Sequence, residues 1–155
     1  MKLRLSVQYG VARAGLPADS ALRRWARAAL KGLRRRRVAL GLRIVGIAES
    51  AALNDRFRRK SYPTNVLSFP FEAPPGTRSD ILGDLVICAP VVRREARTQR
   101  KPVNAHWAHM VVHGILHLRG YDHDNDRDAE VMERREIRLL RLLGYPDPYS
   151  VQSPS

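Results

Sequence analysis

The sequence predicts a single α/β (α+β) domain in which a small mixed four-stranded sheet packs with about five helices. The chain has 155 residues, the size of one ordinary domain, and 44% of them are hydrophobic, which is enough to bury a core. Segments with the two-residue period of strands interleave with segments of helical period, without an internal repeat or an interdomain linker. We therefore expect one domain over residues 1–146 and a loose C-terminal tail over 147–155.

Four segments are expected to form the strands of this sheet. Residues 2–9 alternate apolar and polar side chains, as a half-buried strand does, and residues 38–48 are the second candidate. Residues 64–69 form a third strand that ends at Pro70, and residues 82–88 form the fourth. Because proline cannot donate a hydrogen bond to a neighbouring strand, the third strand is expected at an edge of the sheet.

The helices are expected between and after these strands. The first is predicted from about Asp19 to Arg36, and Ser50 is a candidate N-cap for a short second helix that ends near Arg59. The last helix is expected to end before Gly144 and Pro146, because glycine and proline terminate helices. Three further helical segments are expected, at residues 93–99, 104–118 and 126–143.

The chain is strongly basic. It has 28 Lys and Arg against 15 Asp and Glu, a formal net charge of +13 and a pI near 11.1. A field of this sign concentrates polyanions, so nucleic acid is the first candidate partner and an anionic membrane surface the second. The run Arg34–Arg37 has two interpretations that the sequence leaves open: contact with RNA, or a solvated helix face.

Cysteine content and the N-terminus favour the cytoplasm. Cys88 is the only cysteine, so no internal disulfide can form. The first residues lack the apolar run of a signal peptide, and no apolar stretch reaches the length that crosses a bilayer. We expect a cytoplasmic protein that makes no membrane contact.

All five histidines lie between residues 106 and 123, and three of them have metal-ligand spacing. His113 and His117 are one helical turn apart on the same face. A continuing helix would carry His123 about 9 Å further along the axis, too far to share an ion. Gly120 resolves this, because glycine readily adopts the left-handed conformation that ends a helix and lets the chain fold back.

These three imidazoles predict one Zn²⁺ per chain at the end of a central helix. Three neutral histidines leave a fourth position for water, which is typical of catalytic zinc, and zinc lowers the pKa of such water to about 7. The sequence therefore predicts a metal-dependent hydrolase. Iron, nickel or copper also suit imidazole ligands, so the metal used in the cell stays open.

The residues around the three histidines leave the general base unidentified. Metzincin peptidases have a similar spacing, but Gly114 stands where they carry the glutamate base, which makes that kind of peptide hydrolysis a poor fit. Asp122 could orient water or a ligand, or could cap the following turn, and capping is favoured. His106 and His109 could touch the metal, but packing or hydrogen bonding fits their position upstream of Gly120 better.

Through the residues around these three histidines, the sequence resembles the YbeY family of bacterial endoribonucleases. The family's hallmark is similar to the run HGILHLRGYDH at residues 113–123. Two further blocks, at residues 53–70 and 82–88, match in the expected order. The resemblance covers about residues 48–145, whereas the first 45 residues agree only in their strand–helix–strand layout.

The resemblance implies a specific activity and a specific set of site residues. It implies a zinc ion on His113, His117 and His123, cleavage of single-stranded RNA, maturation of the 16S ribosomal RNA 3′ end and ribosome quality control. Arg58 falls on the family's functional arginine, and a guanidinium can stabilise charge that develops on a phosphate. We take Arg58 and His113 as the catalytic candidates. The implied partners are ribosomal RNA and the small ribosomal subunit, and no DNA.

Two other classes of function remain as alternatives: a zinc hydrolase that acts on another substrate, and a non-catalytic ribosome-assembly factor with structural zinc. Structural zinc usually has four protein ligands, often cysteines, and Cys88 lies on a distant strand. The nucleophile, either water or the RNA 2′-hydroxyl, the cleavage position and the oligomeric state stay open.

Overall fold

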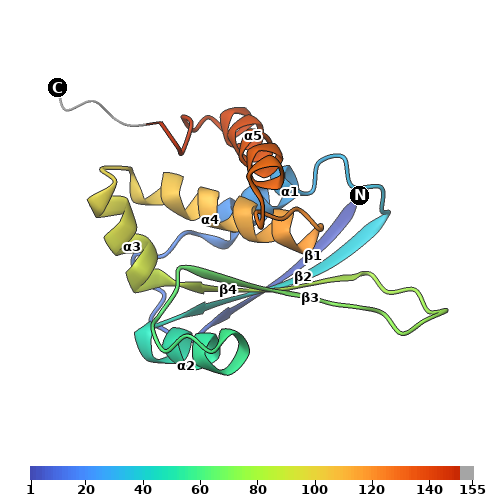
Figure 1. Ribbon diagram of the computed structural model, residues 1–155, viewed down its shortest axis with the longest axis horizontal. Coiled ribbons are helices and arrows are strands. Elements are labelled where there is room, and N and C mark those ends of the chain that lie inside the picture. Colours follow the sequence, from blue (N-terminus) through green and yellow to red (C-terminus); the bar gives the residue numbers. More distant parts are fainter. Residues whose placement is uncertain (151–155) are drawn as a thin grey trace.

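A computed structural model describes residues 1–150, so the part of the expected tail at residues 151–155 lies outside the described residues. Four strands and five helices are present in this part of the chain, as predicted (Figure 1). In chain order they are β1 (Lys2–Tyr9), α1 (Asp19–Ala29), β2 (Arg37–Val45), α2 (Ile47–Arg58), β3 (Val66–Pro70), β4 (Ile81–Cys88), α3 (Ala89–Thr98), α4 (Val103–Leu118) and α5 (Asp126–Leu142).

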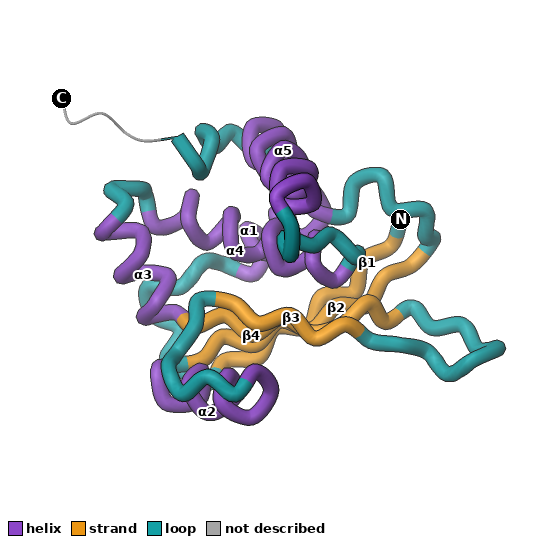
Figure 2. Tube along the Cα trace, viewed as in Figure 1, coloured by secondary structure: helices purple, strands orange, loops and turns teal. Residues whose placement is uncertain are grey.

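The strands form one mixed sheet in the order β1-β2-β4-β3. β1 and β2 are parallel, as are β2 and β4, whereas β3 runs antiparallel to β4 (Figure 2). The prediction that β3 is an edge strand is therefore confirmed. Its last residue, Pro70, pairs with Gly83 at the end of the β3–β4 ladder, where the loop of residues 71–80 begins. A loop was expected over most of this segment.

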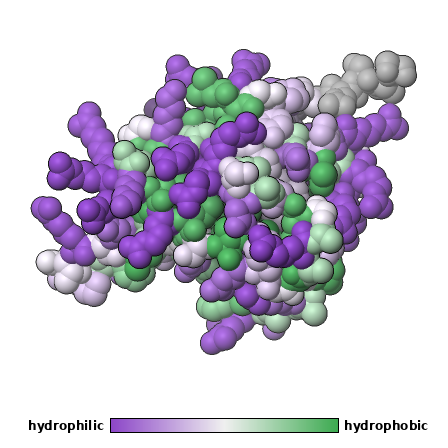
Figure 3. Space-filling model, turned by 180° about the vertical axis from the view of Figure 1, so that it is seen from behind, coloured by the Kyte–Doolittle hydropathy of each residue, from purple (hydrophilic) through white to green (hydrophobic). Residues whose placement is uncertain are grey.

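The helices lie on both faces of the sheet, and the larger core is on the face covered by α1 and α4 (Figure 1). Alternate β2 side chains, Leu40, Leu42 and Ile44, enter this core and meet Trp25 of α1. α2 lies on the opposite face, where Leu53 packs on a smaller cluster that includes Val86. The outer surface is rich in hydrophilic side chains, in keeping with the charge of the chain (Figure 3).

α4 is the central helix, and it packs tightly against the sheet at Gly114. A Cβ atom at this position would lie 2.7 Å from Cδ2 of Leu85 on β4 and 3.2 Å from Cγ2 of Val66 on β3. The Gly114 carbonyl also accepts a hydrogen bond from the Ser68 hydroxyl of β3 at 3.1 Å. Gly114 therefore allows α4 to lie directly against β3 and β4, and no side chain longer than hydrogen fits there without displacement of its neighbours.

The first helix is shorter than predicted. It ends at Ala29 rather than near Arg36, and the chain turns through Gly32, which has a φ of 84°. This early turn brings Arg36 beside β1, where its carbonyl accepts a hydrogen bond from the Lys2 N–H at 2.8 Å. The interpretation of Arg34–Arg37 as a helix face is therefore wrong: residues 34–36 form a loop and Arg37 begins β2.

The junction after the second strand also differs from the prediction. β2 ends at Val45 rather than Ala48, and α2 begins at Ile47 with Gly46 at the N-cap position. Ser50 is therefore inside the helix and is not its cap. Its buried hydroxyl instead pairs with the backbone of Thr64, accepting from the N–H and donating to the carbonyl, both at 3.0 Å. This tertiary contact ties α2 to the segment that leads into β3.

The start of α3 and the C-terminal segment also differ from the prediction. α3 starts at Ala89, directly after β4 and earlier than the predicted residue 93. Part of the expected tail is held in place, because the Pro148 carbonyl accepts a hydrogen bond from Lys101 and Tyr149 bonds to α5. None of the helices among residues 1–150 is long and apolar enough to cross a bilayer.

Replacing Gly114 with alanine tests the packing of α4. In an ordinary helix interior this change stabilises a protein by up to about 1 kcal/mol. Here we expect it to lower the free energy of unfolding by about 1–3 kcal/mol, because the added methyl group meets the fully buried Leu85. Denaturant unfolding measures this difference, and a stabilised Gly114→Ala variant would contradict the close packing of α4 on the sheet.

Candidate metal centre

The structure brings His113, His117 and His123 together. Each offers one ring nitrogen, and these three atoms lie within 4.8 Å of one another. The ring centroids of His113 and His117 are 4.7 Å apart, and those of His117 and His123 are 4.8 Å apart. This spacing suits a zinc ion, since imidazole nitrogens bind zinc at about 2 Å and so lie only a few Å from each other.

The turn after α4 brings in the third histidine in the way that the sequence predicts. Gly120 has a φ of 97°, and its N–H donates to the His117 carbonyl while the Tyr121 N–H donates to the Leu116 carbonyl. These two bonds form a Schellman motif, which ends the helix and reverses the chain. His123 is exposed and His113 and His117 are half-buried, so the group of nitrogens faces solvent on one side.

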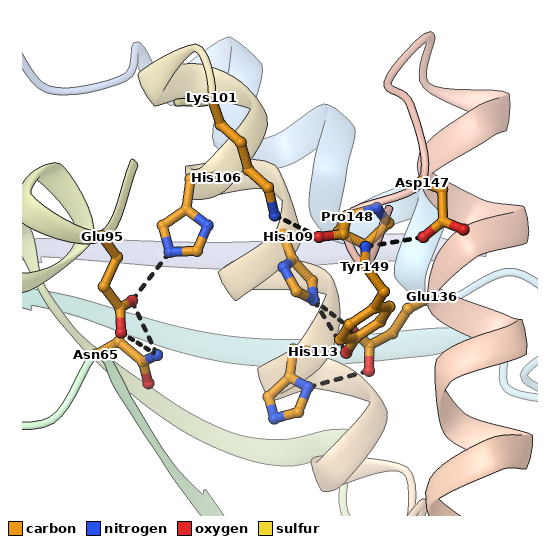
Figure 4. Close-up of polar contacts among 10 residues, drawn as sticks. All are labelled: Asn65, Glu95, Lys101, His106, His109, His113, Glu136, Asp147, Pro148 and Tyr149. Carbon is orange, nitrogen blue, oxygen red and sulfur yellow. Dashed lines mark hydrogen bonds and ion pairs between the residues drawn. The ribbon is translucent and has the colours of Figure 1, made fainter. Parts of the chain in front are cut away.

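Glu136 of α5 is a functional candidate that the sequence analysis missed. Its side chain is fully buried, and one carboxylate oxygen accepts a hydrogen bond from Nδ1 of His113 at 3.1 Å (Figure 4). The other oxygen accepts from Nε2 of His109 at 2.5 Å and from the Tyr149 hydroxyl at 2.8 Å. With Nδ1 of His113 protonated in this way, its Nε2 keeps the lone pair that a metal needs.

This carboxylate is charged at neutral pH. Burial raises the pKa of Glu136, but hydrogen bonds and charge interactions with His109 and His113 outweigh burial and lower the pKa to about 2. The sequence signal for Glu136 was weak, because a glutamate on a helix with many charged residues is usually solvated. Its position one turn from the buried Met132 and Leu139 was the available hint.

The charges around the cluster favour neutral imidazoles. Burial lowers the pKa of His117, and the neighbouring His113 and His123 lower it further, to about 4. The positive charge of Arg58 contributes to the same shift, which places this guanidinium in the electrostatic neighbourhood of the cluster. Arg58 is the last residue of α2, and the ring of its neighbour Phe57 packs edge-to-face on Phe69 of β3 at 5.1 Å.

The other residues singled out in the sequence lie beside the cluster. Nε2 of His106 bonds to Glu95 at 2.9 Å, and Nε2 of His109 bonds to Glu136, so both histidines form hydrogen bonds to carboxylates. The Asp122 carboxylate accepts the backbone N–H of His123 at 2.7 Å, which supports capping rather than orientation of water. The close packing of Gly114 explains why α4 cannot carry a metzincin-type glutamate at that position.

Comparison with known proteins identifies the family. The sequence model described as Endoribonuclease YbeY matches residues 14–144, which extends well upstream of the expected start of the resemblance near residue 48. The chain belongs to the YbeY family. Endoribonuclease YbeY of Alkalilimnicola ehrlichii is 59% identical over 151 residues, covering 95% of this chain and 91% of the relative.

Other members of the YbeY family match over similar lengths. The protein of Methylococcus capsulatus is 59% identical over 134 residues, covering 86% of this chain and 87% of its own. That of Stenotrophomonas maltophilia is 51% identical over 154 residues, covering 97% and 95%. The solution structure of a Thermotoga maritima protein has a TM-score of 0.59 and covers 99% of both chains at 23% identity, which indicates the same fold.

The turn at Gly120 can be tested with a matched pair of variants. Gly120 and Gly144 both end a helix at positive φ, 97° and 90°, and a Cβ atom at either position would meet nothing within 4 Å. We expect Gly120→Ala and Gly144→Ala to cost a similar 1–2 kcal/mol or so of unfolding free energy, from backbone strain alone. Zinc affinity, measured by competition with a chelator, should fall only for Gly120→Ala. Equal zinc affinities would contradict a role of the turn in delivering His123.

Glu136→Gln tests the buried carboxylate. His109 and His113 bond to different oxygens of Glu136, and an amide places an NH2 donor where one of these oxygens lies, so one histidine loses its acceptor. We expect zinc affinity to fall about 10- to 100-fold. Glu133→Gln, an exposed change on the same helix, is the control and should keep the affinity of the parent. Unchanged affinity in a folded Glu136→Gln variant would show that this carboxylate does not prepare His113 for a metal.

Proposed function

We propose that this protein is a zinc-dependent endoribonuclease specific for single-stranded RNA, acting in maturation of the 16S ribosomal RNA 3′ end and in ribosome quality control. The observation that carries the proposal is the half-exposed group of three imidazoles with the cationic Arg58 in its electrostatic neighbourhood. Membership of a family whose relatives are named endoribonucleases supports it. The net charge of +13 supports a polyanionic substrate.

His113, His117 and His123 would hold the zinc ion, one per chain. When bound, zinc supplies Lewis-acid activation of a phosphate oxygen or of water. The residues of the chain have separate tasks. Glu136 fixes the orientation and tautomer of the His113 ring, and Arg58 would hold the scissile phosphate and stabilise the charge that develops on it.

The RNA strand would approach the centre along the outer edge of β3, beside the end of α4, because the contact of Ser68 with Gly114 leaves no space between these two elements. The packing of Phe57 on Phe69 fixes the end of α2 next to β3, so Arg58 is held at this approach. A strand lying there would present its phosphates to both the guanidinium and the metal. A single strand is flexible enough to bring one phosphate to a half-buried centre, whereas the backbone of a duplex is held in a regular helix, which is consistent with single-strand specificity.

The nucleophile is either water or the RNA 2′-hydroxyl. Glu136 is unsuited to act as the general base, because its buried oxygens already accept hydrogen bonds from two histidines and a tyrosine. The product ends distinguish the two nucleophiles: a 2′,3′-cyclic phosphate indicates attack by the 2′-hydroxyl. Among residues 1–150 the imidazole group contains no fourth protein ligand, which favours a catalytic over a structural zinc.

The proposed substrate also indicates the partners of the protein and the compartment in which it acts. Ribosomal RNA and the small ribosomal subunit are the proposed partners, in the cytoplasm. The competing proposal, a zinc hydrolase with a different substrate, makes a different prediction, because it would leave single-stranded RNA intact when the protein is pure and loaded with zinc.

The central test compares the parent with His113→Ala on single- and double-stranded RNA, with and without a chelator. We expect the parent to cleave single-stranded RNA only, and the chelator to stop it. His113→Ala should lose both zinc binding and cleavage, because the central ligand is gone. Cleavage by His113→Ala at the parental rate, or by the parent in excess chelator, would refute the proposal.

Arg58→Ala separates phosphate binding from metal binding. We expect it to lower kcat by roughly 100- to 1,000-fold, the usual effect of removing one group that stabilises transition-state charge, with zinc affinity unchanged. Arg56→Ala is the matched control, since Arg56 is an exposed arginine of the same helix that lies over the Phe57 ring. Equal activities of the two variants would remove Arg58 from the mechanism.

A further inference from the structure

A polar cavity of about 340 Å³ lies beside the metal centre and shares His113 with it. We call it the α3–α4 pocket. It lies between α3, α4 and the C-terminal segment, and its walls include Asn65, Glu95, Gln99, Lys101, His113 and Tyr149 (Figure 4). This volume is within the range of small-ligand sites, about 300–1,000 Å³. A strand of RNA with a phosphate at His113 would therefore bring a neighbouring nucleotide close to this pocket.

The walls of the pocket carry both hydrogen-bond donors and acceptors. The Glu95 carboxylate is held in position by Nε2 of His106 at 2.9 Å and by the Asn65 amide at 3.0 Å. Its side chain is 30% exposed, so it can accept further hydrogen bonds. Lys101 provides N–H donors, and Gln99 forms no side-chain hydrogen bond with any described residue. These groups suit a neutral ligand with polar edges.

Two largely buried imidazoles also line the pocket. His106 is 2% exposed and His109 is 7% exposed, and each uses Nε2 to bond to a carboxylate. Nδ1 of both rings has no hydrogen-bond partner among residues 1–150. Both Nδ1 atoms are themselves buried, so the two rings contribute to the shape of the wall and hold Glu95 and Glu136 in place.

An aromatic ring borders the same cavity. Tyr149 is 43% exposed, while its hydroxyl is anchored to Glu136 at 2.8 Å. Its ring packs edge-to-face on His109 with centroids 5.3 Å apart, which leaves ring surface available for stacking. Proteins that bind single-stranded RNA stack bases on such rings.

We propose that the α3–α4 pocket binds one nucleobase of the RNA, that of a nucleotide next to the scissile phosphate. The inference rests on the proposed function and adds a substrate subsite to it. A phosphate fits poorly, because Glu95 offsets the positive charge of Lys101, whose ammonium already donates to the Pro148 carbonyl. His109, His113 and Glu136 also lie close enough together to hold a metal ion, but Glu136 is fully buried and its oxygens already accept hydrogen bonds from both histidines, so we assign the open part of the pocket to a base. A planar, uncharged base with polar edges satisfies the shape and the chemistry of the walls.

The first test blocks the pocket from its exposed rim. Gln99→Trp adds a large side chain at an exposed lining position, and Thr98→Trp adds the same side chain next to it at a position that does not line the pocket. We expect Gln99→Trp to raise KM for a single-stranded RNA about 10-fold, the scale of one lost base contact, with kcat and zinc affinity nearly unchanged. Thr98→Trp should match the parent.

Abasic substrates then locate the base. An RNA that lacks the base at the bound position should raise KM for the parent by a similar factor, and Gln99→Trp should cause no further increase with that substrate. If Gln99→Trp keeps the parental KM and every abasic RNA flanking the cleavage site is cleaved like the intact RNA, the pocket does not bind a base.

A binding experiment without cleavage keeps the two proposals separate. The four nucleoside 5′-monophosphates are titrated into zinc-loaded protein and followed by NMR signals of His106 and Tyr149, with ribose 5-phosphate as the control that lacks a base. We expect shifts with at least one nucleotide and none with ribose 5-phosphate. Such shifts in a protein that leaves RNA intact would support the pocket and overturn the nuclease, whereas RNA cleavage without these shifts would overturn the pocket alone.

Discussion

The close contact between α4 and the sheet at Gly114 is the constraint on which the rest of the structure depends. With hydrogen as its side chain, this residue lets the helix lie against Leu85 and Val66, while Ile115 and Leu116 of the following turn are buried in the core. His113 and His117 lie on either side of Gly114 in the same helix, so this contact holds the backbone of both residues in place. The same contact excludes a carboxylate at position 114. This centre therefore differs from that of the metzincin peptidases, and another group has to activate the nucleophile.

A second constraint is the buried carboxylate of Glu136. Burying a charge is costly unless hydrogen bonds compensate for it, and here His109, His113 and Tyr149 supply them from α4 and from the C-terminal segment. The arrangement joins α4, α5 and residues 147–150 around one charge. It also sets the tautomer of His113, so that the orientation of a metal ligand depends on the packing of a helix that contributes no ligand itself.

Charge is distributed unevenly around the candidate centre. The excess of basic over acidic residues favours binding of a polyanion in general, whereas the charged side chains near His113 would determine how the polyanion lies. Arg58 adds positive charge near the imidazoles, whereas in the α3–α4 pocket Glu95 offsets the charge of Lys101. A phosphate would therefore be drawn to one side of His113 and an uncharged base to the other, which gives a strand of RNA a defined direction across the site.

The sequence by itself determined the fold class, the number of strands and helices, and the three histidines that the structure brings together. These depend on local periodicity and on spacing within a single helix and its terminal turn at Gly120, and such signals are present in adjacent residues. Only the tertiary structure decided the early end of α1, the pairing of Ser50 with Thr64 and the role of Glu136. Each of these depends on partners 13 or more residues away. Contacts between distant segments, which leave no periodic pattern in the sequence, decide which charged residue is buried and what it binds.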